Sequence, residues 1–182
     1  MIEKKNSISK FKNILSEKDC IGCFNCCYFS KEEIGVLPFL SKEESKKKVY
    51  SKVIEKRKNG FWQIKQSLSK KNNNVAKCFF LDERNHKCKI YKDRPFECAF
   101  WPFVISFEKN KIYVCSVNKD WCPKVTKKKI FNQKTINNIL QYLESNNILK
   151  ELEKKERYIW PMEDYYIKVI EITNKIKKYN EL

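Results

Sequence analysis

The spacing of apolar and polar residues changes along this chain, and each spacing predicts a type of element. From Val75 onward the runs VAKCFFLD, CKIY, WPFVISFE and IYVCSV are short and rich in β-branched and aromatic residues. Turn-like ERNHK and KNK separate them, so the pattern predicts short strands, with FVISFEKNKIYVC (103–115) as a β-hairpin. The stretch FWQIKQSL (61–68) fits either a strand or a short helix.

A helical pattern comes before this strand-rich region. Ser41 stands three residues before Glu44, which is the spacing of a capping box at a helix N-terminus. We therefore expect a helix that begins at Ser41, runs to about Lys58 and is ended by Asn59-Gly60.

Helical patterns return after Pro123. INNILQYLESNNILKELEKK (136–155) has apolar residues at helical spacing with a slip near Asn146, and Pro161 begins a last predicted helix, MEDYYIKVIEITNKIKKY. Together these elements predict an α+β fold. Its small cysteine-rich, metal-centred core with short β-hairpins is flanked by an N-terminal helical region and by C-terminal helices.

The 182 residues are enough for one domain with a helical appendage. We expect an N-terminal arm over residues 1–19, a cysteine-cluster domain over 20–125 and a C-terminal helical extension over 126–182 that packs on it. Hydrophobic residues make up 42% of the chain, which argues against a disordered protein. Its three glycines have neither of the common spacings of phosphate-binding loops, so most nucleotide-binding functions are excluded.

Nine cysteines are the main chemical feature of the sequence. The first 19 residues lack the apolar stretch of a signal peptide, and no apolar run is long enough to span a membrane, so we expect a cytoplasmic protein with no membrane association. Thiols stay reduced in that compartment, and clustered cysteines there usually serve metal binding or catalysis. The odd number of cysteines also fits poorly with complete disulfide pairing.

The cysteines form a C-x2-C-x2-CC cluster, then two steps of C-x9-C, then two single positions. A C-x2-C step lets two sulfurs converge on one ion, and the triple C-x2-C-x2-C is the spacing of the first three ligands of a bacterial-type iron–sulfur loop. The predicted metal ligands are Cys20, Cys23, Cys26, Cys27, Cys78, Cys88, Cys98 and Cys122. We expect the first four to meet the later ones in space. Cys115 lies in a strand-like run that suits a buried side chain better, and His86 lies in a polar turn near Cys88; whether either ligates stays open.

CIGCFNCC, followed by the pattern C-x-I-Y-x2-R-P-x2-C, resembles the YkgJ-like family known by its CxxCxxCC motif. The resemblance covers roughly residues 20–123 and implies a zinc- or iron-chelating domain. The residues that carry it beyond the first four cysteines are Cys78, Leu81, Cys88, Ile90, Tyr91, Arg94, Pro95, Cys98, Pro102, Cys122 and Pro123. The glycine that commonly follows the closing Cys-Pro is replaced here by Lys124.

Soft thiolates select iron–sulfur clusters, iron or zinc. The triple spacing and the Cys-Pro ending favour an iron–sulfur cluster, of the [4Fe–4S] type, or iron; zinc is the alternative cofactor. Pro95 should hold Arg94 in an extended conformation, from which its guanidinium could donate to thiolates or carbonyls around the cluster. We therefore expect Arg94 to support the bound cofactor.

Three functions follow from these observations. The first is a metalloprotein with a redox or accessory role, and the formal charge of +17 favours an acidic or redox protein as its partner. The second is a zinc-stabilised basic module that binds RNA or another polyanion; nucleic acid is the less favoured partner. The third and weakest is a cluster-dependent enzyme that modifies a protein side chain. It rests only on the related cluster of flagellin lysine methylases, because this chain has no glycine-rich cofactor loop.

Overall fold

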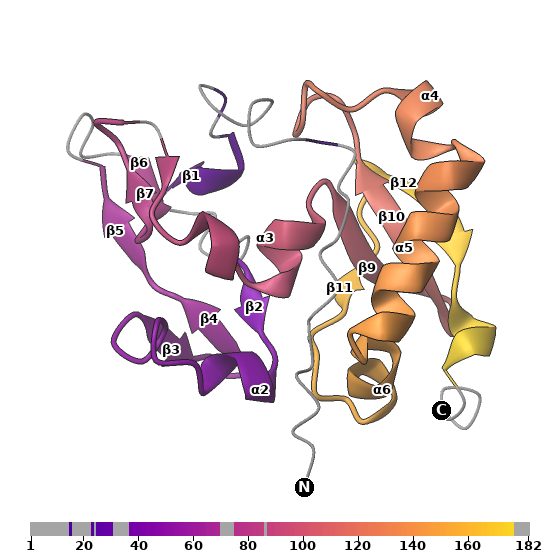
Figure 1. The fold of residues 1–182 in the computed structure, drawn as a ribbon, viewed down its shortest axis with the longest axis horizontal. Helices are drawn as coiled ribbons and strands as arrows, with labels where there is room; N and C mark the ends of the chain where they lie inside the picture. The colour runs from indigo at the N-terminus through magenta and orange to yellow at the C-terminus, as the bar shows by residue number, and fades with distance from the viewer. Residues whose placement is uncertain are drawn as a thin grey trace, which may run out of the picture.

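Strands take up about as many residues as helices in the part of the chain that the computed structural model describes, which is Leu15, Cys23 and residues 25–30, 37–69, 75–85 and 87–176. Within these residues they form four small sheets (Figure 1). The largest has the order β11-β9-β10-β12 and consists of β11 (Trp160–Pro161), β9 (Phe103–Glu108), β10 (Lys111–Val117) and β12 (Tyr166–Glu171).

Three smaller sheets precede it in the sequence. The order β1-β6-β5 joins β1 (Tyr28–Ser30), β6 (Val75–Cys78) and β5 (Gln66–Leu68). The order β2-β4-β3 joins β2 (Phe39–Leu40), β4 (Trp62–Ile64) and β3 (Ile54–Lys56). A two-stranded sheet pairs β7 (Leu81–Asp82) with β8 (Lys87–Cys88).

Short helices connect and cover these sheets. The α-helices are α2 (Lys42–Ser45), α3 (Phe96–Phe100), α4 (Lys127–Ile130), α5 (Gln133–Ser145) and α6 (Ile148–Glu153). The 3-10 helices are η1 (Asn25–Cys27), η3 (Tyr91–Asp93) and η4 (Thr173–Lys175). Figure 1 shows α3 between the small sheets and the four-stranded sheet, which α5 covers. This mixture of helices and antiparallel strands confirms the predicted α+β class.

The predicted β9–β10 hairpin is confirmed. The two strands pair antiparallel from Lys111 opposite Glu108 onward. The turn is made by Lys109 and Asn110, whose φ angles of 48° and 62° are left-handed. The predicted slip near Asn146 is also confirmed, because α5 ends there and Asn147, with φ of 59°, begins α6. Asparagine tolerates the left-handed conformation better than most residues, which explains the break.

The predicted helix from Ser41 to Lys58 is wrong beyond its first turn. Ser41 does form the capping box with Glu44, but α2 ends at Ser45. Tyr50 is fully buried and its hydroxyl donates to the Asp93 carbonyl, which holds the following chain in a turn. β3 then pairs with β4 around Gly60, whose φ is 86°. Asn-Gly flanked by alternating residues is a hairpin signal, and here it forms a turn instead of ending a helix.

The predicted helix after Pro161 is also wrong. Its central stretch is the strand β12, which pairs antiparallel with β10 through Tyr166 opposite Val117 and Ile167 opposite Ser116. β10 would otherwise leave its second edge without a partner, and the β-branched residues of YIKVIE suit a pleated surface. Tertiary pairing therefore overrides the helical spacing of its isoleucines.

The main core lies between the four-stranded sheet and the helices α5 and α6. Fully buried Ile112 and Val114 of the sheet belong to one cluster with Ile139, Leu143 and Leu152 of the helices. Phe96, Phe100 and Cys122 belong to the same cluster, so the residues before and after position 125 share a core. In the described part of the chain, none of the helices is long and apolar enough to cross a membrane.

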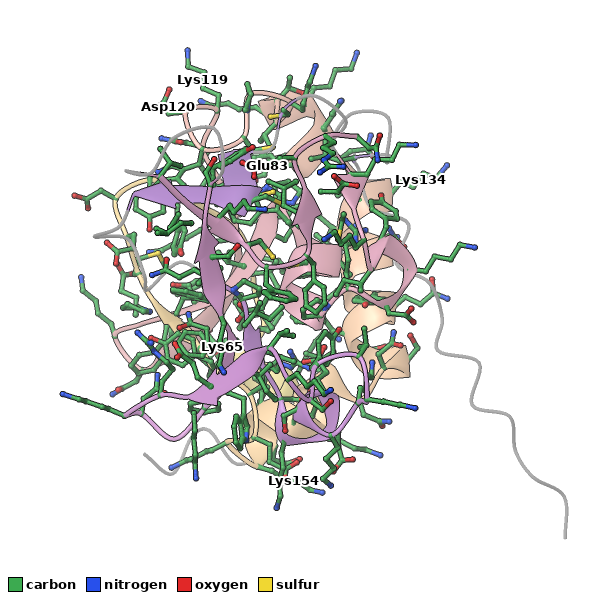
Figure 2. The ribbon with its side chains drawn as sticks, turned by 90° about the vertical axis from the view of Figure 1, so that its left-hand side faces the viewer. Lys65, Glu83, Lys119, Asp120, Lys134 and Lys154 are labelled. Atoms are coloured by element: carbon green, nitrogen blue, oxygen red, sulfur yellow. The ribbon has the colours of Figure 1, made fainter. Side chains whose placement is uncertain are left out.

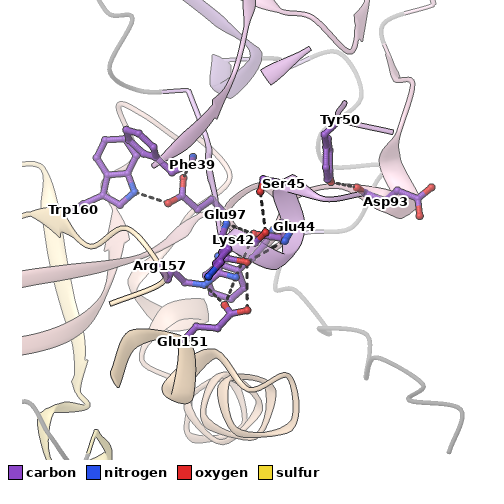
Figure 3. A network of polar contacts seen from close by, with 12 residues as sticks. Phe39, Lys42, Glu44, Ser45, Tyr50, Asp93, Glu97, Glu151, Arg157 and Trp160 are labelled. Carbon is purple, nitrogen blue, oxygen red and sulfur yellow. Dashed lines mark hydrogen bonds and ion pairs between the residues drawn. The ribbon is translucent and has the colours of Figure 1, made fainter. Parts of the chain in front are cut away.

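A buried guanidinium joins the small sheets to the C-terminal segment (Figure 3). Arg157, only 4% exposed, places Nη2 at 2.5 Å from Glu151 Oε2 and at 3.3 Å from Glu44 Oε2. Its Cζ lies 4.3 Å from the centre of the Phe96 ring, and the Phe96 N–H donates to Glu44 Oε1 at 2.6 Å. The three contacted residues lie on α2, α3 and α6.

Replacing this arginine should destabilise the fold strongly. Arg157→Met keeps much of the side-chain volume but leaves a buried carboxylate and a partly buried one without their cation, which should lower the free energy of unfolding by about 3–5 kcal/mol in urea titrations. Lys168→Met is the control, because the Lys168–Glu108 pair is exposed to solvent and should matter far less. Equal losses from the two variants would show that the buried contacts carry no special weight.

Candidate metal centre

Cysteines from separate parts of the chain line one cavity between the small sheets and the four-stranded sheet. The cavity has a volume of about 170 Å³, and residues of β6, β8, α3, β9 and β11 contribute to its wall. The cysteines that line it are Cys23, Cys26, Cys27, Cys78, Cys88, Cys98 and Cys122. Of the predicted ligands, Cys20 lies outside the described residues, as does His86.

Strand register brings the first cluster to the second. β1 pairs antiparallel with β6, and Tyr28 lies opposite Lys77. Cys27 comes directly before Tyr28 and Cys78 directly after Lys77, so the pairing places these two cysteines side by side at one end of the ladder. The adjacent Cys26 and Cys27 are held in the 3-10 turn η1 that enters β1.

A buried ion pair holds this junction. Glu83, 7% exposed, accepts hydrogen bonds from the Ser69 hydroxyl at 2.5 Å and the Tyr28 hydroxyl at 3.3 Å. Lys77 Nζ lies 3.3 Å from the second oxygen of the same carboxylate and also donates to the Leu81 carbonyl. These contacts hold β1 against β6, and they limit how far Cys27 and Cys78 can separate.

The next two cysteines follow within a short stretch. Cys88 lies opposite Leu81 in the β7–β8 pair, and the neighbouring Lys89 N–H donates to the Phe80 carbonyl at 2.9 Å. Cys98 lies on α3, whose N-cap is Pro95. The β7–β8 pair between Cys78 and Cys88 and the 3-10 turn η3 between Cys88 and Cys98 therefore bring all three to the wall of the same cavity.

Arg94 has the backbone conformation that the following proline predicts. Its backbone is extended, with φ of −56° and ψ of 145°, because Pro95 disfavours the helical conformation for the preceding residue. Its Nε donates to the Tyr91 carbonyl at 3.1 Å, and its Cζ lies 3.8 Å from the centre of the Tyr91 ring. The side chain lines the cavity with the cysteines. Its role toward a bound cofactor stays a prediction.

Glu97 anchors the cysteine-bearing helix to the C-terminal segment (Figure 3). One of its oxygens accepts the Phe39 N–H at 2.9 Å and the other accepts the Trp160 Nε1–H at 3.0 Å. Burial raises the pKa of Glu97 to about 8, and these hydrogen bonds and Arg157 oppose the shift. Because Glu97 directly precedes Cys98, both of these donors help to set the position of that sulfur.

Sequence reasoning did not find this support. The capping box identified Glu44, but no pattern in the sequence connects it to Arg157, which is 113 residues away. Glu97 belongs to no motif or spacing that would mark it in the sequence. An acidic residue directly beside a candidate ligand was the only available signal, and it does not distinguish a buried carboxylate from an exposed one.

The last of these cysteines comes from the loop after β10. The Cys122 N–H donates to the Asn118 carbonyl at 3.0 Å, and the Asn118 side chain accepts the N–H of Asp120, which makes a tight turn. Burial raises the pKa of the Cys122 thiol, while hydrogen bonds from the Lys124 backbone and the Trp101 side chain lower it. This cysteine lines the same cavity as Cys23 and Cys26, and charges on those two cysteines raise its pKa further.

Cys115 belongs to the protein core and not to the cavity. It is fully buried in β10, opposite Val104 and Lys168 of the flanking strands. Burial raises its pKa to about 12, and the charged groups that affect it are Lys168 and Glu108, with no cysteine among them. This environment fits a small buried side chain.

The thiols of the cavity influence one another. Cys27 donates to the Cys26 sulfur, which lowers the pKa of Cys26 and raises that of Cys27. Burial raises the pKa of Cys78 to about 11 and that of Cys98 well above its ordinary value, and charges on neighbouring cysteines add to both shifts. The guanidinium of Arg94 acts in the opposite direction on Cys26 and Cys98. Most of these thiols are therefore protonated when no metal is bound, and a bound metal ion would displace their protons.

The donor set suits zinc or iron, since thiolates in a partly apolar cavity are soft ligands. In the described part of the chain, however, no three cysteine, histidine or carboxylate side chains already form a group that could hold a metal ion. Binding would have to draw the sulfurs together to metal–sulfur distances of about 2.3 Å. It would also release protons, so affinity should fall as the pH falls.

The fold and the cavity define a cysteine-rich α+β domain with the donors of a metal-chelating protein. Residues 19–129 match the model of the CxxCxxCC family, described as "Putative zinc- or iron-chelating domain". The match covers more than half of the chain, and the protein belongs to this family. The resemblance read from the cysteine spacing is thereby confirmed, and the family description supports binding of zinc or iron.

A short stretch is also similar to a curated relative. The chain is 43% identical over 37 residues to the uncharacterized protein MJ0661 of Methanocaldococcus jannaschii. This alignment spans 20% of each chain, so the chain covers about a fifth of that relative's length. No solved structure matches the chain.

Thiol labelling should separate the two environments of cysteine. In reduced, metal-free protein at neutral pH, Cys26 is exposed with a lowered pKa and should react fastest with iodoacetamide among the described cysteines. Cys115 should stay unmodified until the protein unfolds, because its thiol is buried and protonated. Peptide mass spectrometry over a time course measures both. Labelling of Cys115 at the rate of Cys26 under native conditions would contradict this assignment.

Proposed function

We propose that this protein holds an iron–sulfur cluster or iron through clustered cysteine thiolates and serves a redox or accessory role in the cytoplasm. The proposed ligands come from Cys20, Cys23, Cys26, Cys27, Cys78, Cys88, Cys98 and Cys122. The observation that carries the proposal is the convergence of seven of them on one cavity.

Three features support iron over zinc. Cys20, Cys23 and Cys26 have the C-x2-C-x2-C spacing of an iron–sulfur loop, and Cys122-Pro123 resembles the Cys-Pro with which such runs end. The sulfurs come from separate segments, as expected when a fourth ligand is supplied from elsewhere in the chain. A [4Fe–4S] cluster would use four of the thiolates, and the remaining ones would be available to a second metal ion.

Zinc is the alternative, and it implies a different role. Structural zinc sites are closed by four ligands, and their binding energy is folding energy. A protein with such a site would have a basic surface but no redox centre. Binding of RNA or another polyanion would then be the main candidate function. A cluster-dependent protein-modifying activity has no support beyond the family resemblance.

Metal analysis after anaerobic purification tests the proposal. We expect a brown protein with visible charge-transfer absorption, with iron and acid-labile sulfide in stoichiometric amounts. Cys98→Ser should lose most of the metal, because it removes a proposed ligand that lines the cavity with Cys26, Cys78 and Cys88. Cys115→Ser should retain it, because this thiol is buried in β10 and does not line the cavity.

The two cysteine variants also separate the alternatives. A colourless wild-type protein with stoichiometric zinc would contradict the iron proposal but leave the ligand set intact. Equal metal loss from both variants would contradict the ligand set, since the core cysteine would then matter as much as the one that lines the cavity.

Replacement of Arg94 should weaken metal retention without removing a ligand. Its positive charge favours the thiolate forms of Cys26 and Cys98. Arg94→Gln should therefore lower metal affinity by about 10–100-fold in competition with a chelator, as substitutions of groups around metal ligands generally do. Arg84→Gln, at an exposed arginine in the β7–β8 turn, is the control and should bind as wild type does. Unchanged affinity in Arg94→Gln would leave this arginine a purely structural role.

A further inference from the structure

The loop around Cys122 and the helix that follows it carry mostly positive charge. Residues 119–134 contain six lysines and one acidic residue, Asp120. The lysines, which we name the lysine surface, are Lys119, Lys124, Lys127, Lys128, Lys129 and Lys134. All six are exposed.

These lysines are not neutralised by neighbours. Among the described residues no ion pair involves any of them, and the carboxylate of Asp120 accepts from the Asn118 amide instead. Lysines elsewhere on the four-stranded sheet do have acidic partners, as Lys111 has Glu171 and Lys168 has Glu108. The lysine surface is therefore an accumulation of uncompensated charge, which favours contact with an anion.

The backbone beneath this surface is held by the core. Val125 and Ile130 are buried in the main cluster, and the Thr126 hydroxyl accepts the Lys129 N–H at the start of α4. Figure 2 shows the Lys119 and Lys134 side chains pointing away from the ribbon. Phe131, 47% exposed, adds an apolar contact beside them. The backbone that carries these lysines is therefore already packed on the core before a partner binds.

Charge alone does not single out this region. Residues 42–58 carry eight basic and three acidic residues, so their net charge equals that of residues 119–134. The two basic regions differ in where they lie relative to the cavity. Lys124 lines the cavity together with Cys122, and its backbone hydrogen-bonds the Cys122 sulfur. The basic stretch around α2 lies at the other end of the molecule from α4 (Figure 1).

We propose that the lysine surface docks an acidic protein that exchanges electrons with the metal centre. This inference rests on the proposed redox function, because it assigns that centre its partner. Electrostatic complementarity mainly accelerates encounter, and electron-transfer complexes are small and weak, which suits a surface of mobile, hydrated lysines around one apolar side chain. Residues 119–134 contain no arginine, the residue that forks onto phosphates and stacks on bases, so the region favours carboxylates over nucleic acid.

Charge reversal at two matched positions tests the proposal. Both 127–129 and 46–48 are runs of three exposed lysines, so Lys→Glu changes at each run alter the net charge equally. The probe is an acidic flavodoxin, used with the full-length holoprotein. Two quantities are measured at low ionic strength: flavodoxin binding by calorimetry and electron transfer from its hydroquinone by stopped flow.

We expect the triple change at 127–129 to weaken binding and slow electron transfer by about tenfold or more, which is the lower range of electrostatic steering. The change at 46–48 should alter both by less than twofold, and unfolding midpoints should confirm that both variants fold. Equal effects from the two variants, or no binding of flavodoxin to the wild type, would overturn the proposal.

Two further outcomes are informative. If the protein binds flavodoxin through 127–129 but transfers no electrons, docking holds and the redox function fails. A 20-nucleotide oligouridylate serves as the second probe. If it binds more tightly than flavodoxin and loses affinity only with the change at 127–129, the surface is a nucleic-acid site and the acidic-protein proposal is wrong.

Discussion

The ion pair of Arg157 with Glu44 and Glu151 holds the small sheets and the C-terminal helices in one relative position. It joins α2, α3 and α6, elements that are distant in sequence, and its charges are shielded from solvent. A buried cation between two carboxylates is stable only when both partners are in place, so it selects one relative position of these helices. That position also sets α3, because Glu44 accepts the Phe96 N–H and the guanidinium lies over the Phe96 ring. The helix that carries Cys98 is thus positioned partly by residues beyond the end of the family match.

Opposite charges also matter in the cysteine cavity, but there the cation would be a bound metal ion. Burial and mutual repulsion favour protonated thiols, and Arg94 offsets this only in part. The polypeptide brings the sulfurs near one another through strand register and tight turns, and the buried Glu83–Lys77 pair keeps the β1–β6 junction closed. In the described part of the chain these donors line one cavity but do not form a preassembled group that could hold a metal ion. Metal binding would supply the positive charge that allows several thiolates to share this small volume.

Local patterns were reliable where the deciding interaction is itself local. The Ser41–Glu44 capping box, the β9–β10 hairpin and the break between α5 and α6 all depend on residues within a few positions of one another. The two wrong helices failed for the opposite reason. The stretch after Ser45 follows the burial of Tyr50 and pairing around Gly60, and residues 166–171 follow the open edge of β10. Helical spacing is a weak preference, and a buried ring or an unpaired strand edge outweighs it.

The family and the chemistry of the donors can be inferred from the residues alone, because thiolate preference and loop spacing are properties of the residues and of short stretches of backbone. The extended conformation of Arg94 before Pro95 can be inferred in the same way. Long-range contacts are what place Cys27 beside Cys78, bury Cys115 within β10, and let Glu97 and Arg157 anchor the cysteine-bearing helix. These outcomes depend on the register between distant strands and on the burial of charged side chains. Both arise only when segments far apart in the chain pack against each other.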